Sequence, residues 1–287
     1  MGYSQTRNNS KLKGHNKTRS FGVGVTLGAA ILAASSFLSY AFGLLRDRLL
    51  AGQFGASMEL DVYQASFLIP DLILNIFLAG ALASAIVPVL SGYFAKGKNE
   101  EAFRIISFMI NVVLAVIFVI AALCFAFMPF LVQITAPGFV GEKRELLIEV
   151  TRVILLSPLI FGLSNLLGGA LVSLKKFLAY SLSPVLYNLG IVIGIIFLAD
   201  QYGVVGVALS TIIGAFLHLS IRLISILRVG FRYHFIFKPI PKGAYKVFAL
   251  MLPRIFGLLA WQGNLWAFTF FGSTLAEGSV GVFNLAR

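Results

Sequence analysis

Residues 22–50 read GVGVTLGAAILAASSFLSYAFGLLRDRLL. Up to Leu45 the side chains are mostly small or apolar, and the charged triplet Arg46-Asp47-Arg48 follows. A helix needs about 20 predominantly apolar residues to cross the hydrocarbon core of a bilayer. This stretch therefore predicts a membrane-spanning helix that carries three charges near one end.

Similar apolar runs recur along the whole chain of 287 residues. We expect seven full spans and the start of an eighth, at residues 22–50, 60–94, 102–133, 146–173, 178–199, 203–228 and 244–272, and from 279 to the end. Strands of outer-membrane barrels are short and alternate every second residue, so runs of this length exclude a barrel. The predicted fold class is all-α, a polytopic bundle of transmembrane helices.

Composition excludes several classes of protein. Charged residues make up 12% of the chain and hydrophobic residues 59%, whereas an ordinary globular domain is near a quarter charged. A soluble chain this apolar could not cover its own surface. A soluble enzyme, a disordered chain and a nucleic-acid-binding domain are therefore excluded, and we expect no nucleic-acid partner.

Motifs for metal, disulfide or nucleotide chemistry are missing from the sequence. Cys124 is the one cysteine, and the three histidines lie far apart along the chain. There is no P-loop, and no pair of acids at membrane depth has the spacing that an intramembrane enzyme needs to hold Mg²⁺ and pyrophosphate. We therefore expect no enzyme, no metal site and no cofactor.

Basic residues, which give the chain a net charge of +12, gather in alternate connections. They lie in the N-terminal 20 residues and in the connections after the second, fourth and sixth spans, at Lys96, Lys98, Arg104, Lys175, Lys176, Arg222, Arg228, Arg232, Lys238, Lys242 and Lys246. The other connections are acidic on balance. Because cytoplasmic loops are rich in Lys and Arg, we expect a cytoplasmic N-terminus.

The two ends of the chain suggest its organisation. Residues 1–20 are basic and polar, so we expect a disordered cytoplasmic tail that lies against anionic lipid. Phe42-Gly43-Leu44-Leu45 is echoed by Phe256-Gly257-Leu258-Leu259, which suggests a second lobe after six spans. We thus expect a six-helix lobe over 21–242 and the start of a second lobe over 243–287. The chain stops inside an apolar pattern, which suggests a longer protein.

Ionisable groups at membrane depth are the first candidates for function, because each costs about 2.5–3.5 kcal/mol to insert. Arg46, Asp47 and Arg48 are either snorkelling residues at the end of a span or an anion site in a cavity. Asp71 follows Pro70 and either lines a cavity or satisfies amides freed by the proline.

Uncharged polar and small residues are weaker candidates. Gln262 and Asn264 could bond a substrate, although interhelical hydrogen bonds are the commoner use. Gly203, Gly206, Ser210 and Gly214 form a small-residue stripe that is typical of close helix packing.

Several short motifs occur in order along the chain: Ser39-Tyr40-Ala41-Phe42-Gly43-Leu44-Leu45-Arg46-Asp47, Phe54-Gly55-Ala56, Leu60-Asp61, Ile69-Pro70-Asp71-Leu72, Val87-Pro88-Val89-Leu90, Thr135-Ala136-Pro137-Gly138-Phe139, Gly278-Ser279-Val280 and Leu285-Ala286-Arg287. Together they resemble the MurJ/MviN family of lipid II flippases. The match runs in order from about residue 30 to the end.

The resemblance implies the first lobe of a two-lobed transporter fold, from the superfamily of multidrug, oligosaccharidyl-lipid and polysaccharide exporters. It implies flipping of an undecaprenyl-pyrophosphate-linked peptidoglycan precursor to the outer leaflet of a bacterial inner membrane by alternating access, for synthesis of the cell wall. The partners implied are a lipid-linked oligosaccharide, membrane lipids and cell-wall synthesis proteins. By the same resemblance Arg46, Asp47, Asp61 and Arg287 match substrate-site positions of the family, and we add Arg48 and Asp71 as substrate-binding candidates.

This chain departs from the family pattern at four positions. Tyr40, Leu74, Asn75 and Ala79 stand where the family usually has three arginines and an acid. Two alternatives to a lipid II flippase are therefore kept. One is another exporter of the same superfamily, for polysaccharide-linked lipid or drugs, and the other is a non-transporting membrane scaffold.

Overall fold

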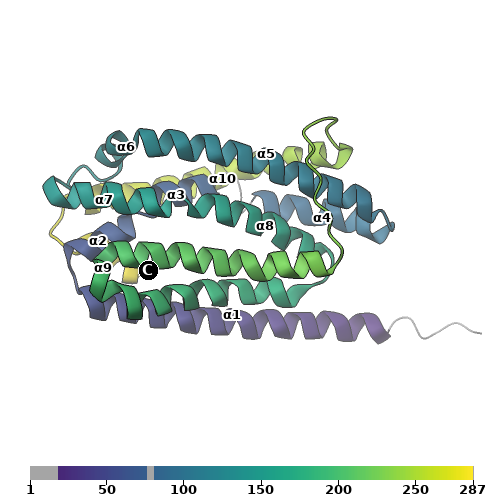
Figure 1. Cartoon of the computed structure of the whole chain (residues 1–287), viewed down its shortest axis with the longest axis horizontal. Coiled ribbons are helices and arrows are strands. Elements are labelled where there is room, and N and C mark those ends of the chain that lie inside the picture. The colour runs from purple at the N-terminus through teal and green to yellow at the C-terminus, as the bar shows by residue number, and fades with distance from the viewer. Residues whose placement is uncertain (1–18, 76–80, 287) are drawn as a thin grey trace, which may run out of the picture.

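The computed structural model describes residues 19–75 and 81–286, and within them all regular secondary structure is helical. The helices are α1 (Arg19–Phe54), α2 (Met58–Ala65), α3 (Leu68–Leu74), α4 (Ala81–Ala95), α5 (Asn99–Ala126), α6 (Met128–Thr135), α7 (Gly141–Ile154), α8 (Ser157–Ser173), α9 (Phe177–Arg228), α10 (Lys242–Gly272) and α11 (Ser279–Ala286). The long helices lie side by side in one elongated bundle (Figure 1). The predicted all-α fold class is confirmed.

Helix α9 covers two expected spans and folds back on itself at Gly203 (Figure 1). Gly203 has φ +55° and ψ −141°, a backbone conformation that is open to glycine and costly for other residues. Beyond this turn the two halves touch, since a Cβ on Gly190 would lie 2.6 Å from the Cα of Gly214. The small-residue stripe is thus confirmed as a packing surface, except that Gly203 belongs to the turn.

Three other expected spans are broken into shorter helices. The segment 60–94 contains α2, α3 and α4, and residues 76–80 within it lie outside the described part of the chain. The segment 102–133 breaks at Phe127. The segment 146–173 breaks after Ile154. Pro129 and Pro158 stand in the first turn of α6 and α8. Proline lacks a backbone donor and fits a helix start, so each favours a new helix over continuation of the old one.

By length and composition, four helical segments of the described residues can cross a membrane: Leu27–Phe54, Asn99–Ala126, Gly141–Ser173 and Phe177–Arg228. The last contains both halves of α9. The expected total of seven spans, and the division into lobes at residue 242, stay predictions.

The connections alternate between the two ends of the bundle (Figure 1). The α4–α5 connection, the α8–α9 connection and the end of α9 lie at one end, and the α6–α7 and α10–α11 connections lie at the other. Lys98 and Lys176 immediately precede α5 and α9, so this first end is the basic one.

Arg222 does not belong to the basic connection in which the sequence pattern placed it. It lies within α9 and is only 3% exposed. Its guanidinium donates to Ser183 Oγ at 2.8 Å and to the Ser164 carbonyl and Asn165 Oδ1, both at 3.0 Å. Arg222 therefore joins α8 to both halves of α9, and it adds nothing to the surface charge at this end of the bundle.

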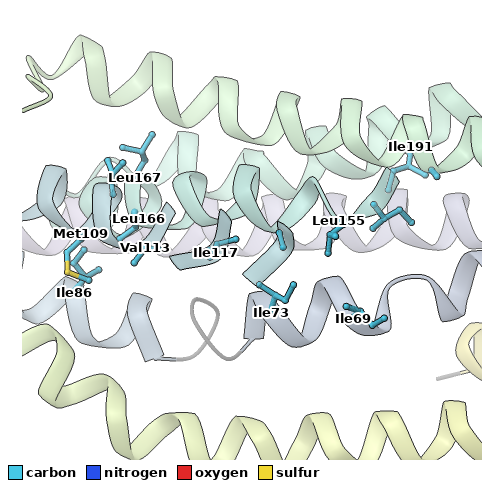
Figure 2. Close-up of a cluster of buried hydrophobic side chains, with 14 of the residues drawn as sticks. Ile69, Ile73, Ile86, Met109, Val113, Ile117, Leu155, Leu166, Leu167 and Ile191 are labelled. Carbon is cyan, nitrogen blue, oxygen red and sulfur yellow. The ribbon is translucent and has the colours of Figure 1, made fainter. Parts of the chain in front are cut away.

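The buried core sits where α3, α4, α5, α8 and α9 meet (Figure 2). Most of its side chains are aliphatic, and they include Ile69, Ile73, Ile86, Met109, Val113, Ile117, Leu155, Leu166, Leu167 and Ile191. Large apolar side chains are also exposed, among them Phe37 at 77%, Phe118 at 62% and Phe197 at 67%. An exposed apolar surface of this kind suits contact with lipid chains.

The close approach of the two α9 halves predicts a specific effect of adding one methyl group. Gly190→Ala places a Cβ against backbone atoms of Gly214, which cannot move aside as a flexible side chain can. We expect a loss of about 1–3 kcal/mol, the usual cost of overpacking, measured as a lower apparent Tm in detergent. Gly92→Ala is the matched control, because a Cβ there has no neighbour within 4 Å; an equal loss in Gly92→Ala would contradict the packing explanation.

Candidate functional site

A cavity of about 260 Å³ lies between the first helices of the chain and the last two. It is lined by Arg46, Leu50, Tyr63, Gln64, Phe67, Leu68, Asp71, Tyr187, Gln262, Leu265, Phe268, Thr269, Phe283 and Asn284. These side chains come from α1, α2, α3, α9, α10 and α11 and from the short break before α3. The cavity therefore joins segments that are far apart in sequence.

Arg46 is held in place by two polar neighbours. Its Nε and Nη2 lie 2.9 and 2.8 Å from Asp47 Oδ1, and its Nη1 donates to Asn188 Oδ1 at 3.2 Å. Asn188 is itself oriented from α1, because its Nδ2 donates to the Ser39 carbonyl and to Ser39 Oγ at 3.2 and 3.3 Å. A guanidinium has five N–H donors in a rigid plane, so Arg46 can keep these contacts and still bind an oxygen in the cavity.

Asp47 acts on the cavity through Arg46. The two side chains are 28% and 33% exposed for Arg46 and Asp47 respectively, so their ion pair is partly screened. Asp47 is not among the side chains that line the cavity. Its place in the structure is that of a residue that orients the arginine.

Asp71 is the second predicted residue that the structure brings to this cavity. It lies in the first turn of α3, where Pro70 is tolerated because the first amides of a helix have no partner within the helix. The break that the proline predicted lies just before it, where Ser66 Oγ donates to the Tyr63 carbonyl at 2.6 Å. Among the described lining residues, the charges are thus one cation, Arg46, and one anion, Asp71.

Of the other predicted residues, the structure places Arg48, Asp47 and Asp61 outside the cavity lining. Arg48 is exposed on α1, and Arg287 lies outside the described residues. Asp61 is only 1% exposed and accepts three short bonds, from Lys143 Nζ at 2.6 Å and from the amides of Gly278 and Gly281, both at 2.7 Å. Asp61 therefore ties α2 and α7 to the start of α11.

Neighbouring contacts strengthen this tie at the same end of the bundle. The Met58 amide donates to Glu277 Oε1 at 2.9 Å, and the Gly138 amide donates to Ser273 Oγ at 3.1 Å. Gly278 has φ +85°, and a Cβ there would lie 2.7 Å from the Ala56 carbonyl oxygen. The chain after α10 thus approaches the α1–α2 connection closely enough that only glycine fits at this position.

Gln262 lies on the wall of the cavity and links two helices, the more common of the two roles expected for it. Its Oε1 accepts from Asn75 Nδ2 at 3.1 Å, and its Nε2 donates to the Leu68 carbonyl at 3.5 Å. Asn75, where the family resemblance leads us to expect an arginine, contributes a neutral amide that joins α3 to α10.

Sequence reasoning missed Asn188, Tyr187 and Lys143. Asn188 carries a signal that could have been used, since a lone amide inside a long apolar run marks a polar contact at membrane depth. Tyr187 and Lys143 carry no such signal, because their partners are brought to them only by the fold. In the described part of the chain, no group of three or more His, Cys, Asp or Glu is close enough to hold a metal ion.

The fold defines a class of membrane transporter. A structure described as "Outward-facing conformation of a multidrug resistance MATE family transporter of the MOP superfamily" has a TM-score of 0.68 and 17% identity, and the match covers 90% of this chain and 58% of that chain. A structure described as "Lipid II flippase MurJ, inward closed conformation" has a TM-score of 0.75 and 26% identity, covering 90% and 53%. The chain has the fold of transporters of the MOP superfamily.

Sequence comparison gives the family within this class. The family model described as "Lipid II flippase MurJ" matches residues 50–287. A "Probable lipid II flippase MurJ" of Rickettsia prowazekii is 28% identical, over 88% of this chain and 50% of the relative, and the "Lipid II flippase MurJ" of Burkholderia cenocepacia is 27% identical, over 90% and 52%. The chain belongs to the MurJ lipid II flippase family. It spans about half the length of the curated relatives it matches.

The contacts of Asp61 predict that removing its charge frees the start of α11. Asp61→Asn loses the ion pair with Lys143 and one of two strong acceptors for the Gly278 and Gly281 amides. Breaking a buried pair costs about 3–5 kcal/mol, so we expect much faster amide hydrogen exchange over residues 276–286, measured by mass spectrometry.

The matched control is a pair on the surface. Lys98 and Glu101 are each about half exposed, and the hydrogen bond from Lys98 to Glu101 raises the pKa of Lys98. Glu101→Gln should leave exchange over residues 276–286 unchanged, since exposed pairs contribute little. Wild-type exchange rates in Asp61→Asn would show that this carboxylate does not fasten α11.

Proposed function

We propose that this chain forms the first lobe of a lipid flippase, with its transport site at the Arg46 cavity. The substrate class is a lipid-linked oligosaccharide of the peptidoglycan precursor type, moved from the inner to the outer leaflet of a bacterial plasma membrane. The one observation that carries the proposal is an arginine in an apolar helix, fixed by Asn188 and Asp47 at the wall of a cavity that six helices share.

The physical task explains why such an arginine is useful. A bare pyrophosphate in hydrocarbon is prohibitively costly, so a flippase must replace its water with protein donors. Arginine donates two parallel, charge-assisted hydrogen bonds to phosphate oxygens. Because Asn188 and Asp47 already fix the Arg46 side chain, little of its conformational entropy is lost when the ligand binds.

The proposed movement is alternating access around this cavity. The Asp61 contacts close one end of the bundle between α2, α7 and α11. Opening that end requires these bonds to break while the helix cores stay intact. In this proposal the protein forms and breaks no covalent bond. Its partners are membrane lipids and cell-wall synthesis proteins.

A second candidate function has a specific observation in its favour. The charged side chains among the described lining residues are Arg46 and Asp71, one of each sign, and the position of a usual family arginine is filled by the neutral Asn75. This balance suits a substrate that is less anionic than a pyrophosphate, such as another cargo of the same superfamily. A competition experiment separates the two candidates: an excess of a monophosphate-linked or zwitterionic lipid should not slow the flipping of a pyrophosphate-linked one if the first candidate is right.

Removing the Arg46 side chain tests the site. In the complete transporter, Arg46→Ala should reduce translocation of a fluorescent pyrophosphate-linked lipid in proteoliposomes at least about 100-fold, because two charge-assisted bonds are lost. Arg104→Ala is the control, since Arg104 is exposed on α5 and does not line the cavity. Wild-type translocation in Arg46→Ala, with normal insertion of both variants, would exclude the cavity as the transport site.

We further propose that the N-terminus and the basic end of the bundle face the cytoplasm. In a Cys124→Ser background, single cysteines at the exposed positions Lys176→Cys and Glu142→Cys report the two ends. A membrane-impermeant maleimide added to intact spheroplasts should label Glu142→Cys and should label Lys176→Cys only after permeabilisation. Labelling of Lys176→Cys in intact spheroplasts, with Glu142→Cys labelled only after permeabilisation, would show that the basic end faces outward and would contradict the proposed orientation.

A further inference from the structure

A second hollow of about 710 Å³ lies between the N-terminal part of α1 and the two halves of α9. Most of its lining is aliphatic or aromatic, and the full set is Leu27, Gly28, Ile31, Lys175, Lys176, Phe177, Leu178, Ala179, Leu182, Leu186, Leu217, Ser220, Ile221, Ile224, Ser225 and Arg228. We call this the α1–α9 groove. It shares no residue with the Arg46 cavity.

The shape of the groove depends on a close approach at its floor. A Cβ at Gly28 would lie 2.8 Å from the ring of Phe177, so α1 touches the start of α9 there only because residue 28 has no side chain. Farther out, the exposed Leu27, Leu178 and Leu217 leave apolar walls that no other described helix covers. The apolar hollow is therefore open to its surroundings.

All charged residues in the lining are basic. Lys175 and Lys176 form the connection between α8 and α9, and Arg228 is the last residue of α9. The hairpin of α9 brings its end back beside its start, so these three exposed cations collect at one end of the apolar groove. The α1–α9 groove is thus apolar along most of its length and positively charged at one end, and we call these three cations its rim.

We propose that the α1–α9 groove binds one anionic phospholipid of the surrounding membrane. An acyl chain lies along the apolar walls, and the headgroup phosphate lies at the rim against Lys175, Lys176 and Arg228. The charge pattern selects this occupant, because basic pockets between helices at a membrane surface favour anionic headgroups. A neutral or zwitterionic lipid could fill the groove but would gain little from three cations. The site is separate from the proposed transport site.

The size of the expected preference follows from the charges. One Lys or Arg near an anionic lipid surface contributes a factor of about five in affinity. If the lipid headgroup contacts at least one of the three cations, the groove should therefore bind an anionic lipid at least about fivefold more tightly than phosphatidylcholine. A generic lipid contact would show a ratio close to one.

The preference can be measured with a tryptophan placed in the groove. In a Trp261→Phe, Trp266→Phe background, Leu178→Trp puts the one tryptophan of the chain on the groove wall. The full chain is reconstituted in nanodiscs of phosphatidylcholine, and dibrominated phosphatidylglycerol or dibrominated phosphatidylcholine is titrated in. The ratio of the two quenching curves gives the selectivity of the site.

Two sets of variants decide the outcome. Lys175→Gln, Lys176→Gln and Arg228→Gln together should bring the selectivity to about one. Lys96→Gln, Lys238→Gln and Lys246→Gln together remove the same charge from exposed residues outside the groove, and should leave the selectivity unchanged.

A quenching ratio of phosphatidylglycerol to phosphatidylcholine close to one, measured with Lys175, Lys176 and Arg228 unchanged, overturns the proposal, because the groove would then be an unselective lipid contact. An equal loss of selectivity in both triple variants also overturns it, since the preference would then come from overall charge. Selectivity that only the rim variant loses supports the site. Circular dichroism and elution volume show that each variant is folded, and a single Lys176→Gln change, which should reduce the ratio partially, replaces the triple variant if that one unfolds.

Discussion

The structure depends on one constraint: in hydrocarbon, every backbone amide and carbonyl must find a partner within the protein. Continuous helices meet this requirement, and each interruption has to be compensated locally. The turn at Gly203 does so with a conformation that glycine adopts without strain, and the breaks before α6 and α8 use prolines whose missing donor costs nothing in a first turn. The architecture of broken and folded helices is the consequence.

The same constraint governs the polar side chains, which are few and which join helices that are far apart in sequence. Arg46 is joined to α9 through Asn188, and Arg222 joins α8 to both halves of α9. Asp61 joins α2, α7 and α11. An unpaired polar group is costly in an apolar interior, so each of these contacts fixes an arrangement as well as adding stability. The proposed site and the architecture therefore use the same small set of residues.

The hydrophobic pattern predicted the fold class, the approximate ranges of α1 and α10 and the α9 turn region, because apolar length is a direct physical requirement of a membrane helix. It did not predict the breaks at Phe127 and Leu155, which look like any other apolar residue, although Pro129 and Pro158 just after them favour the start of a new helix. Of the predicted site residues, Arg46 and Asp71 meet in one cavity. The place of Asp61 could not be predicted, because its partners Lys143, Gly278 and Gly281 lie more than 80 positions away along the chain.

The contact between α3 and α10 is made by uncharged side chains. Asn75 and Gln262 pair there as neutral amides, at a position where the family resemblance leads us to expect an arginine. An amide pair holds the two helices together and needs no counter-charge, whereas adjacent arginines would repel one another and require an anion between them. Asn75 does not line the cavity, and Arg46 and Asp71 are the charged side chains of the described lining. Under the proposed function, recognition of a pyrophosphate by the described lining rests on the fixed geometry of Arg46, so we expect Asn188, which supplies that geometry, to matter to recognition together with the arginine.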